Sequence, residues 1–292
     1  MLSAVFWLKK LKKEMTMVMR YFTVKGCFLV LLLSAFSCMY IPAFAKKKVR
    51  KIVLDAGHGG KDPGCHGLYS FEKDITLSVT KKVGELLDKE FKKDVSVAYT
   101  RTYDILPPDN IVSVSQSLIY RTEFANREKG DLFISIHVNS TPRRNSPVKG
   151  TLVLVCGPTR IDEKEGSIGE NVPNIGEKEE LLDPNDPATS IIIAQYSQAF
   201  LNKSIVLGEK INTEFQNQGR STEGVRQQSL QVLASTAMPG VLVEIGYLNN
   251  SEEEAYLNSE EGQTAVATAI FNGIKYYKEE IEKDPIEVKI EN

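Results

Sequence analysis

The stretch Ile52-Val53-Leu54-Asp55-Ala56-Gly57-His58-Gly59-Gly60 indicates what kind of fold this chain adopts. It begins with three branched apolar residues and turns into a glycine-rich segment, as a buried strand does where it leaves a sheet. Short apolar runs of the same kind recur at 133–136, 152–155 and 241–243. Such runs are typical of strands that are covered on both faces.

Between these runs lie segments with the spacing of amphipathic helices. Apolar residues repeat every three or four positions over 75–91, 193–215 and 266–281. Strands that alternate with such helices predict an α/β fold with a mostly parallel, twisted sheet and helices on both faces. The length of the chain suits a single domain of this type. We expect this domain over 46–283, followed by a polar tail over 284–292.

The first 45 residues differ in composition from the rest of the chain. Six Lys or Arg side chains precede the apolar run Cys27–Phe36, and Ala43-Phe44-Ala45 then offers small residues at the spacing of a cleavage site. This pattern predicts a signal peptide and an exported protein, placed in the periplasm or cell envelope. The run is shorter than the ~18 residues of a membrane span, so an uncleaved anchor is the weaker interpretation. Lipid attachment at Cys38 is a minor alternative.

Charge and cysteine content exclude some classes of protein. The chain carries a formal net charge of −2, and residues 1–45 hold six Lys or Arg and one Glu, so the remainder carries −7. An acidic balance argues against nucleic acid as a partner. We also expect a monomer. After loss of residues 1–45, Cys65 and Cys156 remain, too few for a disulfide framework, although one bridge between them stays open.

Four polar residues stand where this fold places its ligands, beyond the carboxyl ends of the strands or at a helix start. His58 follows the first strand, His137 closes the strand over 133–136, and Glu244 closes the strand over 241–243. Glu72 lies at the start of the first long helix. A catalytic zinc site typically takes three His, Asp or Glu ligands, and a nearby carboxylate accepts a proton from water. These four residues are therefore the candidate site.

Each candidate also has a simpler structural explanation. A glycine-rich loop around His58 could cradle a phosphate, although the lysine and helix start of a phosphate loop are missing. Glu72 would gain roughly 0.3–1 kcal/mol from the helix dipole alone. A lone histidine such as His137 is more often a satisfied strand-end residue. Glu244 could pair with Arg226, but an acid inside an apolar strand is almost never buried unless it is paired or functional.

One segment interrupts the alternation of strands and helices. Residues 160–187 show no apolar period and are rich in acids. We expect a long acidic surface insertion there, because loops of this length inside a compact domain are usually functional or disordered.

Together these segments resemble the zinc-dependent N-acetylmuramoyl-L-alanine amidases, bacterial enzymes that act on peptidoglycan. The resemblance runs from about Lys51 to Tyr277. It rests on six ordered motifs: Leu54–Gly64, Glu72-Lys73-Asp74, Thr100–Asp104, Arg121 with Ala125-Asn126, Asp131–Ser140 and Met238–Asn250.

The resemblance implies that His58, Glu72 and His137 bind one catalytic Zn²⁺ and that Glu244 is the catalytic glutamate. It also implies hydrolysis of the amide bond between N-acetylmuramic acid and L-alanine in peptidoglycan, during cell-wall turnover and daughter-cell separation. A zinc peptidase that cuts within the stem peptide and a non-catalytic peptidoglycan-binding module are the alternatives. His66 lies at no ligand position of the family.

Neighbouring residues have expected supporting roles. Asp55 and Asn139 flank the ligands and could orient them, since ligand histidines usually donate their second N–H to an oxygen. For Arg101 and Arg121 a scaffold role is favoured over substrate binding.

The acidic insertion at 160–187 resembles the place where some cell-division amidases carry an autoinhibitory segment that a partner protein displaces. Our hypothesis is that it does the same here, under an activator protein, with Glu179 or Glu180 offered to the metal. A disordered acidic loop is the equal alternative.

Overall fold

Six strands form one sheet in the order β2-β1-β3-β6-β4-β5 in the computed structural model, which describes residues 48–109, 113–171 and 187–283. The strands are β1 (Lys51–Ala56), β2 (Ser96–Tyr99), β3 (Leu132–Asn139), β4 (Thr151–Cys156), β5 (Thr222–Gln228) and β6 (Gly240–Tyr247). All neighbouring strands are parallel except β4 and β6, which are antiparallel. The described residues belong to one compact unit, so the predicted α/β domain with a mostly parallel sheet is confirmed.

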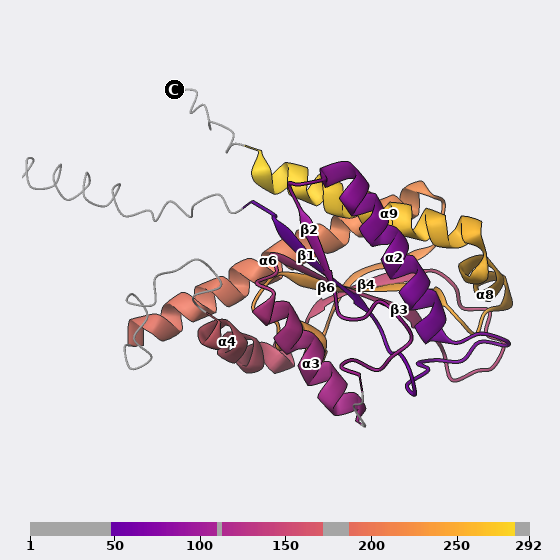
Figure 1. The fold of residues 1–292 in the computed structure, drawn as a ribbon, viewed down its shortest axis with the longest axis horizontal. Coiled ribbons are helices and arrows are strands. Elements are labelled where there is room, and N and C mark those ends of the chain that lie inside the picture. Colours follow the sequence, from indigo (N-terminus) through magenta and orange to yellow (C-terminus); the bar gives the residue numbers. More distant parts are fainter. Residues whose placement is uncertain (1–47, 110–112, 172–186, 284–292) are drawn as a thin grey trace, which may run out of the picture. The chain divides into compact units, whose positions relative to one another are not determined.

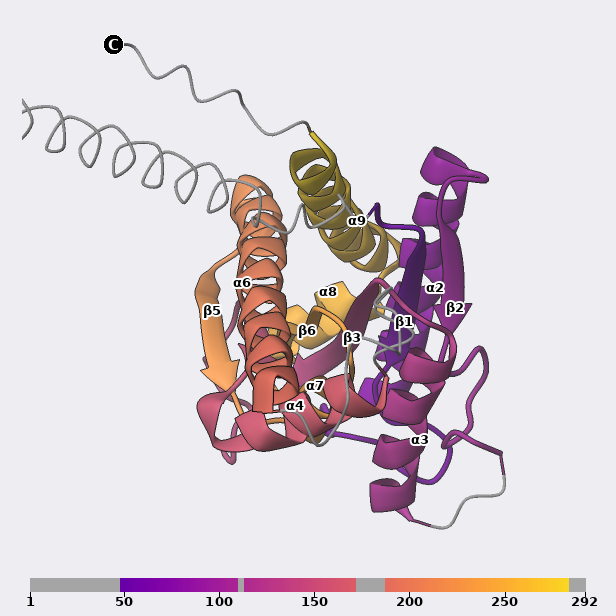
Figure 2. The ribbon, with the colours of Figure 1, turned by 90° about the vertical axis from the view of Figure 1, so that its left-hand side faces the viewer.

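The helices are α2 (Glu72–Phe91), α3 (Val114–Arg127), α4 (Ile161–Glu170), α6 (Pro187–Asn217), α7 (Gln231–Ala234), α8 (Ser251–Asn258) and α9 (Glu260–Glu282), with a 3-10 turn at Pro158–Arg160. The three long helical patterns of the sequence are α2, α6 and α9, which pack side by side (Figure 1). In Figure 2, α3 and α7 lie on the opposite side of the sheet from α9, and β2 and β5 form its two edges. Helices therefore cover both faces, as predicted.

Alternation along the strands divides the core into two clusters, one on each face of the sheet. Ile52 and Leu54 of β1 pack into the larger cluster with α2, α6 and α9. Val53, between them, packs into a smaller cluster with residues of α3 and α7. Successive side chains of a strand point to opposite faces, so every central strand must be apolar on both. This explains why the central strands are recognisable in the sequence as continuous apolar runs.

The prediction of an irregular loop at the start of the acidic insertion is wrong. Residues Ile161–Glu170 form α4, whose Ile168 is fully buried beside Phe200. The buried ammonium of Lys164 donates to the carbonyl oxygens of Leu233, Thr236 and Met238, and burial lowers its pKa to about 8. Lys164 and Ile168, together with the buried Ser167, thus fix a helix in which four of the remaining positions are acidic.

Several other expectations fall on residues outside the described ranges. These are the signal peptide at 1–45, the polar tail at 284–292, and Glu179 and Glu180 of the insertion. Over the described residues, none of the helices combines the length and apolar character that crossing a membrane would require. Cys65 and Cys156 are free thiols, so the structure contains no bridge between them.

Candidate metal centre

His58, Glu72 and His137 converge at the carboxyl ends of β1 and β3. The Oε1 of Glu72 lies 3.2 Å from Nε2 of His58 and 2.9 Å from Nδ1 of His137. One possible ligand atom from each residue lies within 4.8 Å of the other two. The two imidazole rings meet edge to face, with their centroids 4.9 Å apart. The structure therefore brings together all three of the ligands expected from the sequence.

His58 is held in a backbone conformation that few residues other than glycine adopt. Its φ angle is 61°, in the left-handed region, which is uncommon for a non-glycine residue. Its Nδ1 lies 2.8 Å from Oδ2 of Asp62, and its carbonyl oxygen accepts a hydrogen bond from Arg121. With the Nδ1 proton donated to Asp62, the Nε2 lone pair faces Glu72 and is free to bind a metal.

Glu72 is the first residue of α2 and is almost completely buried. The backbone N–H of Cys65 donates to its Oε2 and that of Val138 to its Oε1, at 2.8 and 3.0 Å. Burial acts to raise the pKa of this carboxyl, but hydrogen bonds and charges of His137 and His58 outweigh it and hold the pKa well below its ordinary value. Glu72 therefore makes specific contacts that a favourable interaction with the helix dipole alone does not explain.

Two glycines of the first motif allow these side chains to approach. A Cβ atom on Gly57 would lie 2.4 Å from Cε1 of His137. A Cβ atom on Gly64 would lie 2.5 Å from Oε2 of Glu72, and the φ angle of Gly64 is 67°. Both contacts are far shorter than van der Waals distance, so the close approach of the His137 and Glu72 side chains explains these glycines.

Glu244 stands opposite His137 in the register of β6 and β3. Its Oε2 is buried and, within the described residues, has no hydrogen-bond partner. Burial raises the pKa of Glu244 to about 7, helped by the charge of Glu72 and opposed by the two histidines. The alternative of a structural pair with Arg226 is wrong, because Arg226 instead pairs with Glu223 at 2.9 Å. A buried carboxylate oxygen without a partner is costly and is typical of functional sites.

Asp55 contributes to the site indirectly. It accepts hydrogen bonds from Ser135, Thr100 and the guanidinium of Arg121. Burial acts to raise the pKa of Asp55, but the charge of Arg121 and the two hydroxyl donors lower it to about 2. Arg121 in turn donates to the carbonyl oxygens of Ala56 and His58. The pair thereby fixes the backbone from which His58 projects.

Contacts of the remaining supporting residues agree only partly with expectation. Arg101 donates to the carbonyl oxygens of Ala56, Gly57 and Lys73, which is the scaffold role favoured from the sequence. Asn139 accepts through Oδ1 from the N–H of Ser140. Among these supporting residues, the one that contacts the imidazole of a candidate ligand is Asp62, to which the sequence analysis gave no role. A carboxylate four positions after a candidate ligand is the signal that identifies it.

His66 lies outside the ligand set, as expected. Its ring packs edge to face on Phe71, with centroids 4.8 Å apart.

On the side of α3, a cavity of about 180 Å³ adjoins the candidate ligands and is lined by His58, His137, Leu106 and Leu118, among others.

The donor set fits a single transition-metal ion. Two imidazole nitrogens and one carboxylate oxygen are a frequent zinc-ligand combination, and three protein ligands leave coordination positions for other groups. The unpartnered Oε2 of Glu244 lies on the neighbouring strand, where it can meet such a group.

Comparison with known proteins agrees with this geometry. A sequence model of the N-acetylmuramoyl-L-alanine amidase family matches residues 52–276. The probable N-acetylmuramoyl-L-alanine amidase AmiB of Haemophilus influenzae is 30% identical over 239 residues, covering 76% of this chain and 51% of that protein. AmiC of Escherichia coli O6:H1 is 32% identical over 238 residues, covering 77% of this chain and 52% of that protein. This chain thus spans about half the length of these two relatives.

Solved structures give the same result for the domain. The catalytic domain of CwlV, an N-acetylmuramoyl-L-alanine amidase from Bacillus (Paenibacillus) polymyxa, superposes with a TM-score of 0.55 at 28% identity, covering 79% of this chain and 98% of that one. AmiC2 of Nostoc punctiforme superposes with a TM-score of 0.53 at 27% identity, covering 79% and 97%. The matched residues and the fold show that this chain belongs to the N-acetylmuramoyl-L-alanine amidase family.

Proposed function

We propose that this chain hydrolyses the amide bond between N-acetylmuramic acid and L-alanine in peptidoglycan, with one Zn²⁺ held by His58, Glu72 and His137. Membership of the amidase family supports the reaction. The observation that carries the mechanism is the buried, unpartnered Oε2 of Glu244, in register with the ligand His137. That arrangement is expected of a general base beside a metal, and it has no structural partner to explain it.

When bound, Zn²⁺ would polarise the amide carbonyl and lower the pKa of a water molecule toward about 7. The chain's own residues supply the rest of the chemistry. Asp62 keeps the Nδ1 proton of His58 in place, so that the lone pair of Nε2 remains available to coordinate the metal. Oε2 of Glu244 accepts the proton of the attacking water and then passes it to the amine of the departing L-alanine, which leaves a free lactyl carboxylate.

The test is digestion of purified peptidoglycan by the zinc-loaded chain, with and without a chelator, followed by mass analysis of the fragments. We expect new N-terminal L-alanine and free muramic lactyl carboxylate, both lost on chelation, and one zinc per chain by elemental analysis. Cleavage between two stem-peptide residues would identify a peptidase instead. Binding to peptidoglycan without any cleavage would identify a non-catalytic module.

We further propose that the protein is exported and acts in cell-wall turnover and daughter-cell separation. The composition of residues 1–45 supports export. The mass of the protein recovered from the cell envelope tests it, because cleavage after Ala45 would remove the basic and apolar stretches together. Retention of this segment, or a lipid at Cys38, would contradict it.

The regulatory role of the insertion over 160–187, and the activator protein it implies, stays a prediction. The structure describes this region up to Asn171 and again from Pro187. Removing the residues between them should raise basal hydrolysis if they inhibit the enzyme, and unchanged hydrolysis would count against the idea.

A further inference from the structure

A short hairpin extends from the metal centre. The N–H of Glu72 donates to the carbonyl oxygen of Cys65 at 3.1 Å, and beyond this bond His66 and Phe71 form an antiparallel bridge. The tip of the hairpin is the turn over 67–70. One arm therefore ends at Glu72, a candidate metal ligand, and the other three lie outside the candidate site.

The two sides of this hairpin differ. Glu72 points into the metal centre, and Sγ of Cys65 lies 3.2 Å from the carbonyl oxygen of Val138. Because side chains alternate along each arm, His66 and Phe71 lie on the opposite side of the hairpin. That side faces solvent, since both residues are exposed.

The exposed side and the tip are rich in apolar groups. The side chains of Leu68, Tyr69 and Phe71 are exposed by 42%, 66% and 40%. Three large exposed apolar residues within four positions are more than the scattered single ones of an ordinary surface. We call His66, Leu68, Tyr69 and Phe71 the hairpin platform.

A buried carboxylate holds the tip in place. Glu254 of α8 accepts hydrogen bonds from the N–H groups of Leu68, Tyr69 and Ser70 at 2.8, 2.9 and 3.0 Å, and from the hydroxyl of Ser70 at 2.7 Å. A Cβ atom on Gly67 would collide with Oε1 of Glu254. A buried charge is costly unless it is fully hydrogen-bonded, and here four donors meet it. The backbone of the tip is therefore fixed while its side chains stay exposed.

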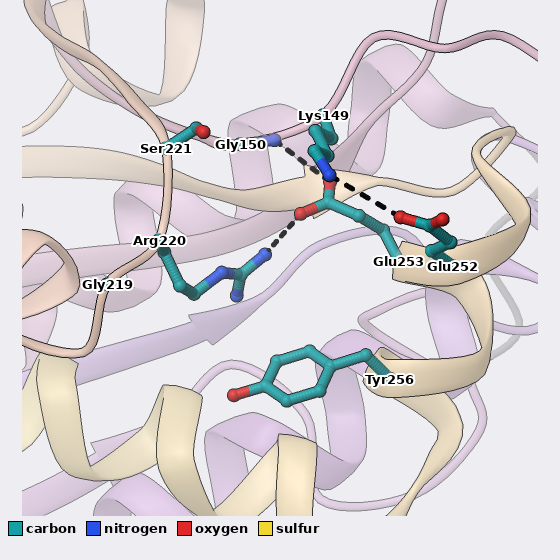
Figure 3. A pocket seen from close by; sticks show the side chains of 8 residues that line it. All are labelled: Lys149, Gly150, Gly219, Arg220, Ser221, Glu252, Glu253 and Tyr256. Carbon is teal, nitrogen blue, oxygen red and sulfur yellow. Dashed lines mark hydrogen bonds and ion pairs between the residues drawn. The ribbon is translucent and has the colours of Figure 1, made fainter.

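The helix that carries Glu254 is itself anchored. Figure 3 shows the ion pair of Glu253 with Arg220, whose closest atoms lie 2.7 Å apart. Arg220 also lies over the ring of Tyr256, at 5.1 Å from its centroid. Glu253 further accepts a hydrogen bond from the N–H of Tyr247, at the end of β6. Because the hairpin tip, α8 and β6 are tied together, the exposed rings of the platform are held in position before any ligand binds.

The composition of the platform favours an uncharged ligand. No Lys, Arg, Asp or Glu stands between Cys65 and Phe71 in the sequence, and the amide of Asn258 is the neighbouring donor to Ser70. An anionic polymer or lipid surface would require cations at this place. Sugar rings offer apolar C–H faces that stack on aromatic rings, and hydroxyl groups that bond to polar tips such as the phenol of Tyr69.

We propose that the hairpin platform binds the sugar chain of peptidoglycan, as a second contact separate from the metal centre. The rings of Tyr69 and Phe71 stack on sugar rings, and Leu68 widens the apolar surface. The proposal rests on the proposed amidase function, because that function supplies the polymer. Two contacts on one polymer strengthen each other through a raised effective concentration, so the platform does not have to touch the sugar whose amide bond is cleaved.

The test measures binding to purified, insoluble peptidoglycan by cosedimentation, in a zinc-loaded Glu244→Gln background that should not cleave it. We expect Tyr69→Ala to raise the Kd for the polymer by about tenfold, which is the effect of losing one well-placed ring. Tyr69→Trp should keep the binding, because it keeps a ring at the same position. Thermal unfolding of the variants should be unchanged, since the backbone of Tyr69, not its side chain, contacts Glu254.

Tyr276 of α9 provides the matched control, because its side chain is exposed by 45%. Its neighbour Lys275 pairs with Glu90 of α2, which lies about 27 Å along that helix from Glu72. Tyr276→Ala should therefore leave binding unchanged. Equal binding by the Tyr69→Ala variant and the unmodified background, or equal losses in the Tyr69 and Tyr276 variants, would overturn the proposal.

Vesicles of equal parts phosphatidylethanolamine and phosphatidylglycerol, and sedimentation of the free protein, test the other occupants. We expect no binding to the vesicles and a monomer in solution. Vesicle binding or dimer formation that is lost with Tyr69→Ala would assign the platform to a membrane or to a second copy of the chain, and would overturn the proposal.

Rates on two substrates separate a second contact from a role in catalysis. In the protein with Glu244 intact, Tyr69→Ala should raise KM for insoluble peptidoglycan and leave the hydrolysis of a soluble muramyl dipeptide, too short to reach both places, unchanged. Equal losses on both substrates would overturn the proposal. Binding of the polymer that depends on Tyr69, without any hydrolysis by the unmodified protein, would refute the function and keep the platform. Normal hydrolysis with binding that does not depend on Tyr69 would refute the platform and keep the function.

Discussion

The two faces of the sheet differ in what covers them. On the face of α2, α6 and α9, the central strands β1, β3 and β6 contribute apolar side chains, and the helices close over them. On the face of α3 and α7, the apolar cluster is smaller. Val53, Phe133 and Leu242 belong to this cluster. Because every second side chain of a strand points to the same face, four polar residues also lie on this second face: Asp55, Ser135, His137 and Glu244. Along the central strands, the residues of the candidate site are therefore separated from the larger apolar cluster by face, because charged groups need hydrogen-bond partners and access that a closed apolar layer denies them. Glu72 joins them from the start of α2.

The largest effect on activity is expected at Glu244, on the face of α3 and α7. Replacing Glu244 with Gln keeps the shape of the side chain but removes its ability to accept a proton. We expect hydrolysis to fall by about 10²- to 10⁴-fold with zinc content and thermal unfolding unchanged. Rates on purified peptidoglycan, with zinc measured on the same samples, provide the check. Near-normal turnover with zinc bound would show that another group is the base.

A change of similar size, but in stability, should come from the apolar face. Ile211 of α6 is fully buried in the larger cluster. Ile211→Ala removes three carbon atoms and should lower the free energy of unfolding by about 2–5 kcal/mol. Urea denaturation measures this, and the activity per folded molecule should stay constant. A loss of zinc affinity in this variant would show that the two faces are more tightly coupled than the packing indicates.

A smaller effect is expected at Asp62, which contacts the ligand His58. Asp62→Asn should weaken zinc binding by about 10- to 100-fold, because the amide holds the imidazole less firmly and no longer increases its basicity. Competition with a chelator of known affinity measures the change. The matched control is Asp74→Asn, an exposed acid in the first turn of α2, which should leave zinc affinity unaltered. Equal losses in both variants would indicate a general charge effect.

The smallest effect should appear at Glu254 of α8, which is buried and accepts hydrogen bonds from the backbone of residues 68–70. Burial acts to raise the pKa of this carboxyl, but hydrogen bonds from the backbone of Tyr69, Leu68 and Ser70 and from the Ser70 hydroxyl lower it. A pKa lowered by folding adds stability above the unfolded pKa of about 4.3, and this stability is lost as the pH falls through the folded value.

Glu254→Gln should therefore reduce the free energy of unfolding at pH 7 by about 1 kcal/mol and flatten its decline below about pH 5. Urea denaturation across this pH range tests the expectation, with Glu261→Gln as the exposed control. An unaltered pH dependence in the Glu254 variant would mean that other carboxylates cause the acid sensitivity.

The sequence was sufficient to predict the central strands, the three long helices and the three residues that meet at the candidate metal centre. The strands of the centre are buried on both faces, so they must be continuous apolar runs. The edge strands β2 and β5 were missed because β2 has four residues and β5 has exposed polar residues over Arg226–Gln228. Helix α4 was missed because its buried side consists of Lys164, Ser167 and Ile168, and a buried lysine or serine has no signature in a pattern of apolar residues.

By itself, the sequence determined which residue types stand at the ends of the strands, because the order of motifs along the chain is a local property. Tertiary structure decided which of them touch. The left-handed backbone at His58 turns its ring toward Asp62 as well as Glu72, and the register of β3 and β6 places Glu244 beside His137 with one oxygen free. Contacts between segments separated by more than a hundred residues depend on how strands pair and helices pack, and no local pattern of residues encodes that geometry.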